Sequence, residues 1–385
     1  MSQFDFSRRV DRRRSGCVKW DDIYFDDLIP LWVADMDFPA APCIQEALHA
    51  RMEHGVYGYE HEPESYFESV QEWFLRRHNW RISREAILPV CGLVQALNAL
   101  VRSLLDPGQS VITQTPCYNG FFPSFVNNGV KLYNNPLLYA DSRYTIDWYD
   151  LERKADLPDT RILLLCNPHN PSGRIWQKDE LERIATICKE HDLILISDEI
   201  HCEVMPMGLA YTPMATIEGI QDRLITMTSP GKGFNIAGLG IGNIIVENAA
   251  LREKVSAALW RNMVPEVTVF GVSALEAAYR HGDEWLDEVN AYIGDNYRFL
   301  LTFVHDAMPR LGITQLEGTY LTWLDHRAFG MTSQEVADRL LNEQHVRVSA
   351  GTLYGEDGEG FMRVNIACPR AQLEEGLQRM RVLFA

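Results

Sequence analysis

Six short apolar runs in the middle of the chain constrain its fold more than any other feature. They are AILPV (86–90), SVITQT (110–115), RILLLC (161–166), LILIS (193–197), RLITMT (223–228) and GNIIV (242–246). Near-continuous apolar strands are typical of a parallel sheet that is covered on both faces. Helix-like stretches at 93–105 and 178–191 separate some of the runs, as in βαβ units. The runs therefore predict an α/β domain.

The pattern changes in the last third of the chain and predicts a second domain. After about residue 250 it is mainly helical, with helix-like stretches at 267–280 and 284–308. Strand-like runs at 319–325, 346–351 and 361–367 then alternate with helix-like runs at 332–344 and 370–384. We expect a large domain over 46–284 and a smaller α+β domain made of 1–45 and 285–385.

Composition excludes several classes of function. The 385 residues carry a formal net charge of -17, from 53 acidic and 36 basic residues, which would repel nucleic acids and anionic membrane surfaces. The eight cysteines are dispersed without metal-ligand spacing, as in a reducing compartment. No signal peptide and no apolar stretch of ~18 residues is present, so we expect a cytoplasmic protein without a metal site, nucleic acid or membrane partner.

Polar and aromatic side chains follow the predicted strands at the points where they end. Ligands of open α/β sheets bind just beyond the carboxyl ends of the strands. The residues at these ends are Gly92, Tyr118, Asn167, Asn170, Asp198, Glu199, His201, Ser229 and Lys232. Gly92, Leu93 and Val94 would also open a helix, whose free N–H groups form an anion site. An amine, a carboxylate, an amide, a ring and an anion site should therefore converge.

This set of groups fits the chemistry of pyridoxal phosphate (PLP). The cofactor needs an amine for its aldehyde, a carboxylate to keep its ring nitrogen protonated, a donor to its phenolic oxygen, a ring to stack on and an anion site. Taken singly, each residue has an ordinary structural interpretation, such as a solvated loop lysine or a carboxylate that caps a turn. Their joint occurrence at successive strand ends favours the cofactor.

Seven motifs give the chain a family resemblance over nearly its whole length. They are LWVADMDFPA (31–40), HGVYGYE (54–60), TPCYNGF (115–121), NPHNPSGR (167–174), SDEIHCE (197–203), SPGKGFNIAGL (229–239) and GFMRVNIACPR (360–370). The chain resembles the fold type I PLP-dependent enzymes of the class I/II aminotransferase superfamily. Within them it looks most like the cystathionine β-lyase-like C–S lyases, a branch that includes maltose-regulon modulator proteins. The resemblance implies a mostly parallel seven-stranded sheet and a smaller α+β domain.

The resemblance also implies roles for five residues around the cofactor ring. Lys232 looks like the lysine that binds the aldehyde and moves the substrate α proton. Asp198 would pair with the ring nitrogen, and Asn170 would bind the phenolic oxygen. Tyr118 is similar to the aromatic residue that stacks on the ring. His201 stands where many aminotransferases have a tyrosine that contacts the phenolic oxygen.

Further residues would hold the phosphate and the substrate, again by resemblance. Gly92, Leu93, Val94 and Ser229 would bind the phosphate. Tyr59 resembles a tyrosine that reaches the phosphate from the neighbouring subunit of a homodimer, with Tyr57 as the other candidate. Arg363 looks like the clamp for the substrate α-carboxylate, while Trp32, Val33 and Ala34 would line that end of the pocket. Lys232 lies between Gly231 and Gly233, where the superfamily commonly has hydroxyl residues.

The resemblance implies PLP-dependent α,β-elimination from a sulfur amino acid such as L-cystathionine. Two alternatives stay open. An aminotransferase needs the same lysine, aspartate and arginine, and only the stretches 31–40 and 54–60 favour the lyase. A regulatory protein on the same scaffold, with a protein partner of its own, is the other alternative.

Overall fold

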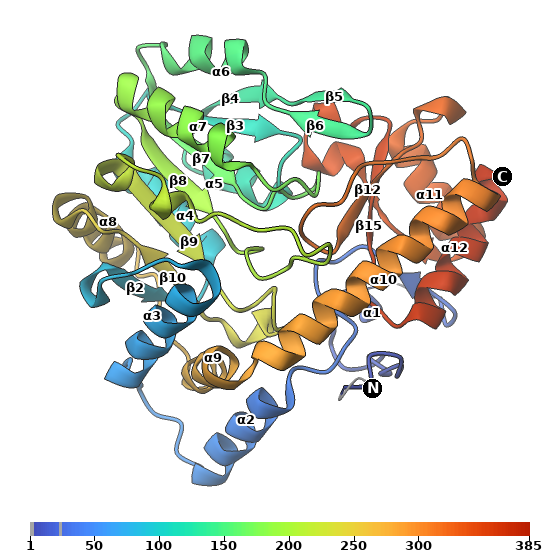
Figure 1. Ribbon diagram of the computed structural model, residues 1–385, viewed down its shortest axis with the longest axis horizontal. Helices are drawn as coiled ribbons and strands as arrows, with labels where there is room; N and C mark the ends of the chain where they lie inside the picture. Colours follow the sequence, from blue (N-terminus) through green and yellow to red (C-terminus); the bar gives the residue numbers. More distant parts are fainter. Residues whose placement is uncertain (1–3, 23–24) are drawn as a thin grey trace.

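A seven-stranded mixed sheet forms the centre of the computed structural model, which describes residues 4–22 and 25–385 (Figure 1). In spatial order its strands are β2 (Ile87–Val90), β10 (Gly242–Ile245), β9 (Leu224–Thr228), β8 (Ile194–Asp198), β7 (Thr160–Cys166), β3 (Ser110–Thr115) and β4 (Lys131–Pro136). β10 runs in the opposite direction to the other six strands. The predicted α/β class and mostly parallel seven-stranded sheet are confirmed.

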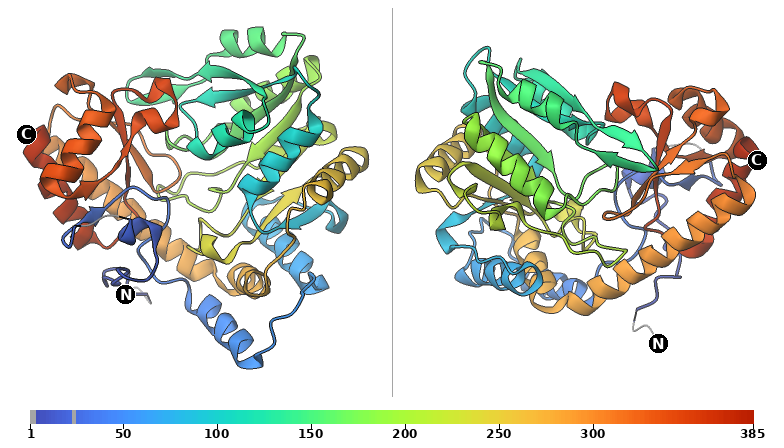
Figure 2. Two further views of the ribbon diagram at one scale, coloured as in Figure 1. Left: turned by 180° about the vertical axis from the view of Figure 1, so that it is seen from behind. Right: turned by 45° about the horizontal axis from the view of Figure 1, so that its top comes forward.

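Five helices cover the two faces of this sheet (Figures 1 and 2). The first face packs against α4 (Leu93–Leu104), α5 (Phe122–Val126) and α8 (Ala249–Arg261), and the second against α6 (Trp148–Ala155) and α7 (Lys178–Glu190). Side chains alternate between the faces along a strand. In β7, Leu164 therefore joins the first core and Leu163 the second, and both are fully buried.

The edge strand β4 is the one strand of this sheet that the apolar runs did not predict. Its sequence, KLYNNP, contains two asparagines and an exposed lysine. An edge strand has a partner on one side only and can leave polar residues in solvent. β4 therefore lacks the continuous apolar character of the central strands.

The chain beyond β10 builds a second sheet. After α9 (Val269–His281), the long helix α10 (Asp283–Ala307) leads to it (Figure 1). This sheet has the order β11 (Gly312–Ile313), β12 (Leu321–Asp325), β15 (Phe361–Asn365), β14 (Ser349–Ala350), and it is accompanied by α11 (Ser333–Gln344) and α12 (Arg370–Phe384). The run 346–351, which we expected to be one strand, divides into β13 (Val346–Arg347) and β14, which belong to different sheets.

The N-terminal segment joins this C-terminal part. The two-residue strand β1 (Ile29–Pro30) pairs in parallel with β13. Helices α1 (Val18–Asp21), α2 (Pro42–His54) and α3 (Glu64–His78) and the hairpin of β5 (Leu138–Ala140) and β6 (Arg143–Thr145) complete the regular elements. We propose the predicted division into 46–284 and 1–45 plus 285–385, because the strand pairing of β1 groups the N-terminal segment with the second sheet.

A buried ion cluster anchors the N-terminal segment. Lys19 Nζ lies 2.8 Å from Asp37 Oδ2, and both side chains are almost fully buried. Arg12 contacts Asp37 at 2.7 Å and Asp35 at 2.5 Å. Breaking a buried ion pair by removing one partner is strongly destabilising. The cluster therefore ties residues 35–37 to residues 12 and 19, and Gln372 of α12 joins it by donating from Nε2 to Asp37 Oδ2 (2.9 Å).

The described helices include none with the length and apolar character needed to span a membrane. All eight cysteines are free, and five of them are buried.

Candidate active site

The predicted strand-end residues meet around one cavity of about 170 Å³. It lies at the carboxyl ends of β7, β8 and β9 and at the N-terminus of α4. Eight of the predicted residues line it: Ala34, Leu93, Val94, Tyr118, Asn170, Asp198, His201 and Lys232. A second cavity of about 530 Å³ shares Ala34 and Lys232 with the first and is also lined by Val33. Lys232 therefore borders both cavities, of which we call the smaller the inner cavity and the larger the outer cavity.

Asp198 is the last residue of β8 and is 5% exposed. Its Oδ1 accepts a hydrogen bond from the N–H of Ile200 (3.1 Å), and among the described residues it forms no ion pair. Burial raises the pKa of Asp198 to about 6. A buried carboxylate without a cation is costly, so this position favours a ligand that brings a positive charge.

Lys232 lies in the tight turn that follows β9 and is half-buried. Burial lowers the pKa of Lys232 to about 8, and the positive charge of Arg363 acts in the same direction. Its Nζ donates a hydrogen bond to the carbonyl oxygen of Ala34 (2.6 Å). A lowered pKa makes the neutral, nucleophilic amine accessible near neutral pH.

Close packing explains a glycine beside this lysine. A Cβ atom on Gly233 would lie 2.7 Å from Cβ of Glu203, which is closer than two non-bonded carbon atoms can approach. A Cβ atom on Gly231 would lie 3.2 Å from Cα of Ala237. The side chain of a hydroxyl residue at 233 would therefore clash, which accounts for this departure from the superfamily pattern.

Arg363 connects two other predicted residues, Asn170 and Trp32. It lies on β15 and is 5% exposed. Its Nη1 donates to Oδ1 of Asn170 (3.0 Å) and its Nη2 to the carbonyl oxygen of Trp32 (2.7 Å), while its Nε is buried without a partner. The guanidinium stacks on the ring of Tyr354 at 4.7 Å. Arg363 is thus held rigidly, with its buried Nε–H still available to a ligand such as a carboxylate.

His201 and Tyr118 supply rings at the same cavity. His201 is buried, and burial, with the charges of Lys232 and Arg363, places its pKa well below the ordinary value. Its Nδ1 is buried without a partner. Tyr118 packs edge-on against Phe121, with ring centroids 5.4 Å apart, and is half-buried. A neutral histidine nitrogen and an accessible aromatic face are therefore available to a ligand.

The expected phosphate site is only partly formed by side chains. Gly92 precedes α4 and offers no side-chain cap to the helix, so backbone N–H groups would be the donors. Ser229 differs from the expectation, because its hydroxyl donates to the carbonyl oxygen of Ile241 (2.6 Å) and accepts from the N–H of Gly231 (3.0 Å). In this structure its hydroxyl proton therefore stabilises the turn around Lys232.

Tyr59 and Tyr57 are both absent from the cavity lining of their own chain. Tyr57 donates its hydroxyl to the carbonyl oxygen of Met52 (2.8 Å) and packs on Phe270. Tyr59 is fully exposed. Of the two hydroxyls, that of Tyr59 is thus the one directed to solvent, where a neighbouring subunit could be reached.

Several lining residues were missed from the sequence. Cys166 ends β7 directly beside Asp198 in the strand register, so the rule of strand ends could have identified it. Phe121, Leu97 and Met227 also line the cavity, but as apolar residues in apolar runs they carry no signal of their own. Tyr354 lies in a turn of the small sheet, and only the folded chain brings it to Arg363.

The residues present fit PLP. Asp198 is a buried carboxylate in need of a cation, and Lys232 is an amine with a lowered pKa at the same cavity. His201 Nδ1 and Arg363 Nε are buried nitrogens without partners. Each of these unsatisfied groups matches a charged or polar atom of the cofactor or its substrate.

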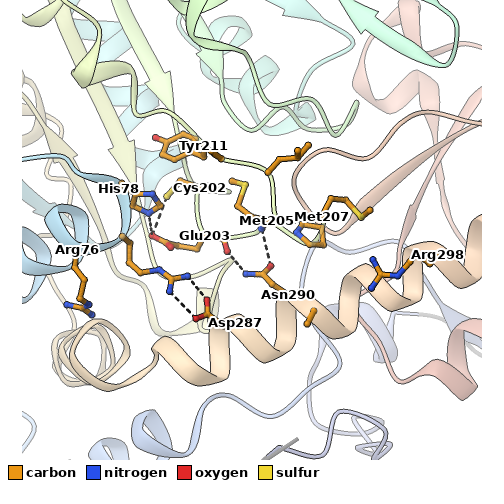
Figure 3. A pocket seen from close by; sticks show the side chains of 16 residues that line it. Arg76, His78, Cys202, Glu203, Met205, Met207, Tyr211, Asp287, Asn290 and Arg298 are labelled. Carbon is orange, nitrogen blue, oxygen red and sulfur yellow. Dashed lines mark hydrogen bonds and ion pairs between the residues drawn. The ribbon is translucent and has the colours of Figure 1, made fainter.

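A third cavity, of about 630 Å³, shares no lining residue with the two cavities at this site, and Figure 3 shows the side chains that line it. His78, Cys202 and Glu203 offer potential metal-ligand atoms within 4.8 Å of one another there. However, Glu203 Oε1 already accepts hydrogen bonds from Trp73 Nε1 (2.6 Å) and His78 Nε2 (3.0 Å). We interpret the cluster as a buried hydrogen-bond network that supports the segment after His201.

Comparison with known proteins identifies the family. The model of the aminotransferase class I and II family matches residues 26–380. The chain belongs to this family. It is 39% identical to cystathionine β-lyase PatB of Bacillus subtilis (strain 168) over 99% of this chain and 100% of PatB, and 33% identical to protein MalY of Escherichia coli (strain K12) over 97% of each.

A solved structure extends the comparison to three dimensions. The crystal structure of cystalysin from Treponema denticola, which contains a pyridoxal 5'-phosphate cofactor, is 34% identical and covers 98% of both chains with a TM-score of 0.95. The predicted family and fold type are therefore confirmed. The cofactor predicted from the sequence is the one bound in this related structure.

The desolvated carboxylate leads to a prediction about stability. Because the pKa of Asp198 is raised, the folded cofactor-free protein keeps a proton between about pH 4 and 6 that the unfolded chain has released. Its free energy of unfolding should therefore fall as the pH rises through that range. Asp198→Asn should abolish this loss and stabilise the cofactor-free protein at pH 8 by up to about 3 kcal/mol.

Urea unfolding at pH 4 and pH 8 measures this effect. Asp338→Asn, which changes an exposed carboxylate on α11, is the control and should behave like the wild type at both pH values. A difference between Asp198→Asn and the wild type that does not grow from pH 4 to pH 8 would contradict the burial argument.

Proposed function

We propose that this protein is a PLP-dependent carbon–sulfur β-lyase. It would catalyse the α,β-elimination of L-cystathionine or a related S-substituted cysteine to pyruvate, ammonia and a thiol. The observation that carries the proposal is that Lys232, whose pKa is about 8, and the buried carboxylate of Asp198 line the same cavity. The 39% identity to a cystathionine β-lyase over the full length supports the reaction type.

Different residues of the chain would bind different parts of the cofactor. Asp198 would bind the ring nitrogen, Tyr118 would stack on the ring, and Asn170 and His201 would bind the phenolic oxygen. The N–H groups of Gly92, Leu93 and Val94 would bind the phosphate, with Ser229 in support through the turn. When bound, PLP supplies an electrophilic aldehyde and a ring that withdraws electrons from the substrate α carbon.

Arg363 and Lys232 would act on the substrate. The guanidinium of Arg363 would bind the α-carboxylate and so fix the orientation of the amino acid. Lys232 Nζ, as a neutral amine, would remove the α proton, and the thiolate would leave from the β carbon. Trp32, Val33 and Ala34 would border the carboxylate, and the outer cavity of about 530 Å³ has room for the sulfur substituent.

Product analysis tests the proposal and separates it from transamination. The protein with PLP should release pyruvate from L-cystathionine without any added 2-oxo acid, because elimination needs no amino acceptor. Lys232→Ala should lower the rate at least about a thousandfold, since a general base contributes on that scale. Lys178→Ala, which removes an exposed lysine, should leave the rate unchanged.

Pyruvate can be followed continuously with lactate dehydrogenase and NADH. If no pyruvate is released without a 2-oxo acid, and amino-group transfer occurs when one is added, the protein is an aminotransferase and the lyase proposal fails. Unchanged elimination by folded Lys232→Ala would remove this lysine from the mechanism.

We further propose a homodimer in which Tyr59 reaches the phosphate of the neighbouring subunit. The full exposure of Tyr59 in one chain supports this arrangement. The cytoplasmic location and a regulatory protein partner stay predictions from the sequence. Recovery of bound proteins from cell extract on the immobilised holoenzyme would test the partner.

The two tyrosines make a matched pair for this proposal. Tyr59→Phe should raise the dissociation constant for PLP about tenfold, because it removes one hydrogen bond to a charged phosphate. Tyr57→Phe should leave it unchanged, since that hydroxyl bonds to Met52 in its own chain. Titration of the cofactor-free protein with PLP, alongside sedimentation analysis, gives both the constant and the oligomeric state. Equal effects of the two substitutions would contradict the assignment.

A further inference from the structure

Side chains from three distant segments bind the main-chain carbonyls of four consecutive residues, 32–35. The oxygen of Trp32 accepts from Arg363 Nη2 (2.7 Å), those of Val33 and Asp35 accept from Asn365 Nδ2 (2.6 Å each), and that of Ala34 accepts from Lys232 Nζ (2.6 Å) and the hydroxyl of Tyr320 (3.0 Å). Each main-chain carbonyl of residues 32–35 is therefore held by its own side-chain hydrogen bond.

Residues 33–35 form a tight turn, in which the carbonyl of Ala34 meets other donors than the carbonyls of Val33 and Asp35. The N–H of Asp35 donates to the oxygen of Val33 (2.9 Å), so Ala34 is the central residue of a three-residue turn. Asn365 binds the first and third carbonyls of this turn. The carbonyl of Ala34 instead meets Lys232 and Tyr320. The turn therefore presents a single acceptor to the lysine.

Tyr320 is well placed to hold that acceptor. It directly precedes β12, and its side chain is 1% exposed. Its ring packs edge-on against His201, with centroids 6.0 Å apart. Tyr320 is therefore a rigid donor, since both its ring and its hydroxyl have fixed partners. Its hydroxyl shares the oxygen of Ala34 with Lys232.

We propose that Tyr320 and Asn365 are positioning residues that hold the carbonyl of Ala34 as the acceptor orienting the Lys232 amine. A neutral amine has one lone pair, and a hydrogen bond from one of its N–H groups to a fixed oxygen restricts where that lone pair points. Once the substrate amine has displaced Lys232 from the cofactor, this hydrogen bond holds the freed base in a defined orientation, which reduces the entropic cost of proton transfer. The inference rests on the proposed role of Lys232 as the base.

The hydrogen bond also has an electrostatic consequence. A carbonyl that accepts from the charged form of a lysine stabilises that form, so it raises the lysine pKa against the effect of burial. If the carbonyl of Ala34 loses its anchors and moves, this stabilisation is lost. The pKa of Lys232 should then fall further below its wild-type value.

Tyr320→Phe removes one hydroxyl and keeps the ring. With PLP bound, it should lower kcat for elimination about tenfold while KM stays within about twofold, because one aligning hydrogen bond is lost and the carboxylate clamp is untouched. Tyr297→Phe is the matched control, since its buried hydroxyl also donates to a main-chain carbonyl, that of Thr314 (3.2 Å), outside the site. The control should keep the wild-type kcat.

A second measurement needs no substrate and no cofactor. Competitive acetylation of the full-length cofactor-free protein as a function of pH, followed by peptide mapping, gives the pKa of Lys232. It should fall in Tyr320→Phe and in Asn365→Ala but not in Tyr297→Phe. A Lys232 pKa that is unchanged or raised in Tyr320→Phe, or a kcat loss that Tyr297→Phe equals, would overturn the inference. Because the labelling is independent of the reaction, this result is distinguishable from failure of the lyase proposal.

Discussion

The desolvated carboxylate of Asp198 is the constraint around which this site is organised. It ends a strand with both faces buried, and the surrounding protein supplies an N–H group and no ion pair from the described residues. Such a group destabilises the empty fold, and buried groups with perturbed pKa values are concentrated at functional sites. A cofactor with a cationic ring nitrogen would satisfy it. The contact between Asp198 and this nitrogen would thus both bind the cofactor and let its ring withdraw electrons from the substrate.

The second requirement is to bring the amine of Lys232 to this carboxylate in a defined orientation. The turn after β9 sets the lysine at the cavity, and its close approach to Glu203 requires Gly233. Residues 33–35 border the same cavity as this lysine, and the buried pair of Lys19 and Asp37 is joined to α12 through a hydrogen bond from Gln372. The N-terminal segment therefore contributes to the site, although the central sheet begins far later in the chain.

Much of this organisation could be predicted from the sequence, for identifiable reasons. Buried parallel strands are continuous apolar runs, and ligand groups follow their ends, so Asp198, Asn170 and Lys232 could be recognised together. The polar edge strand β4 gave no such signal. Arg363 and Trp32 were found only through the family resemblance. Tyr320 and Asn365 act on main-chain carbonyls, and a carbonyl has no residue type by which a sequence could reveal it.

The position of the covalent link between protein and cofactor tests this account most directly. Reduction of the PLP-loaded protein with borohydride converts a labile carbon–nitrogen bond into a permanent one, and proteolysis with mass spectrometry then locates it. We expect a single modified peptide, with the cofactor attached to Lys232. A modification on any other lysine, or none at all in a protein that binds PLP, would contradict it.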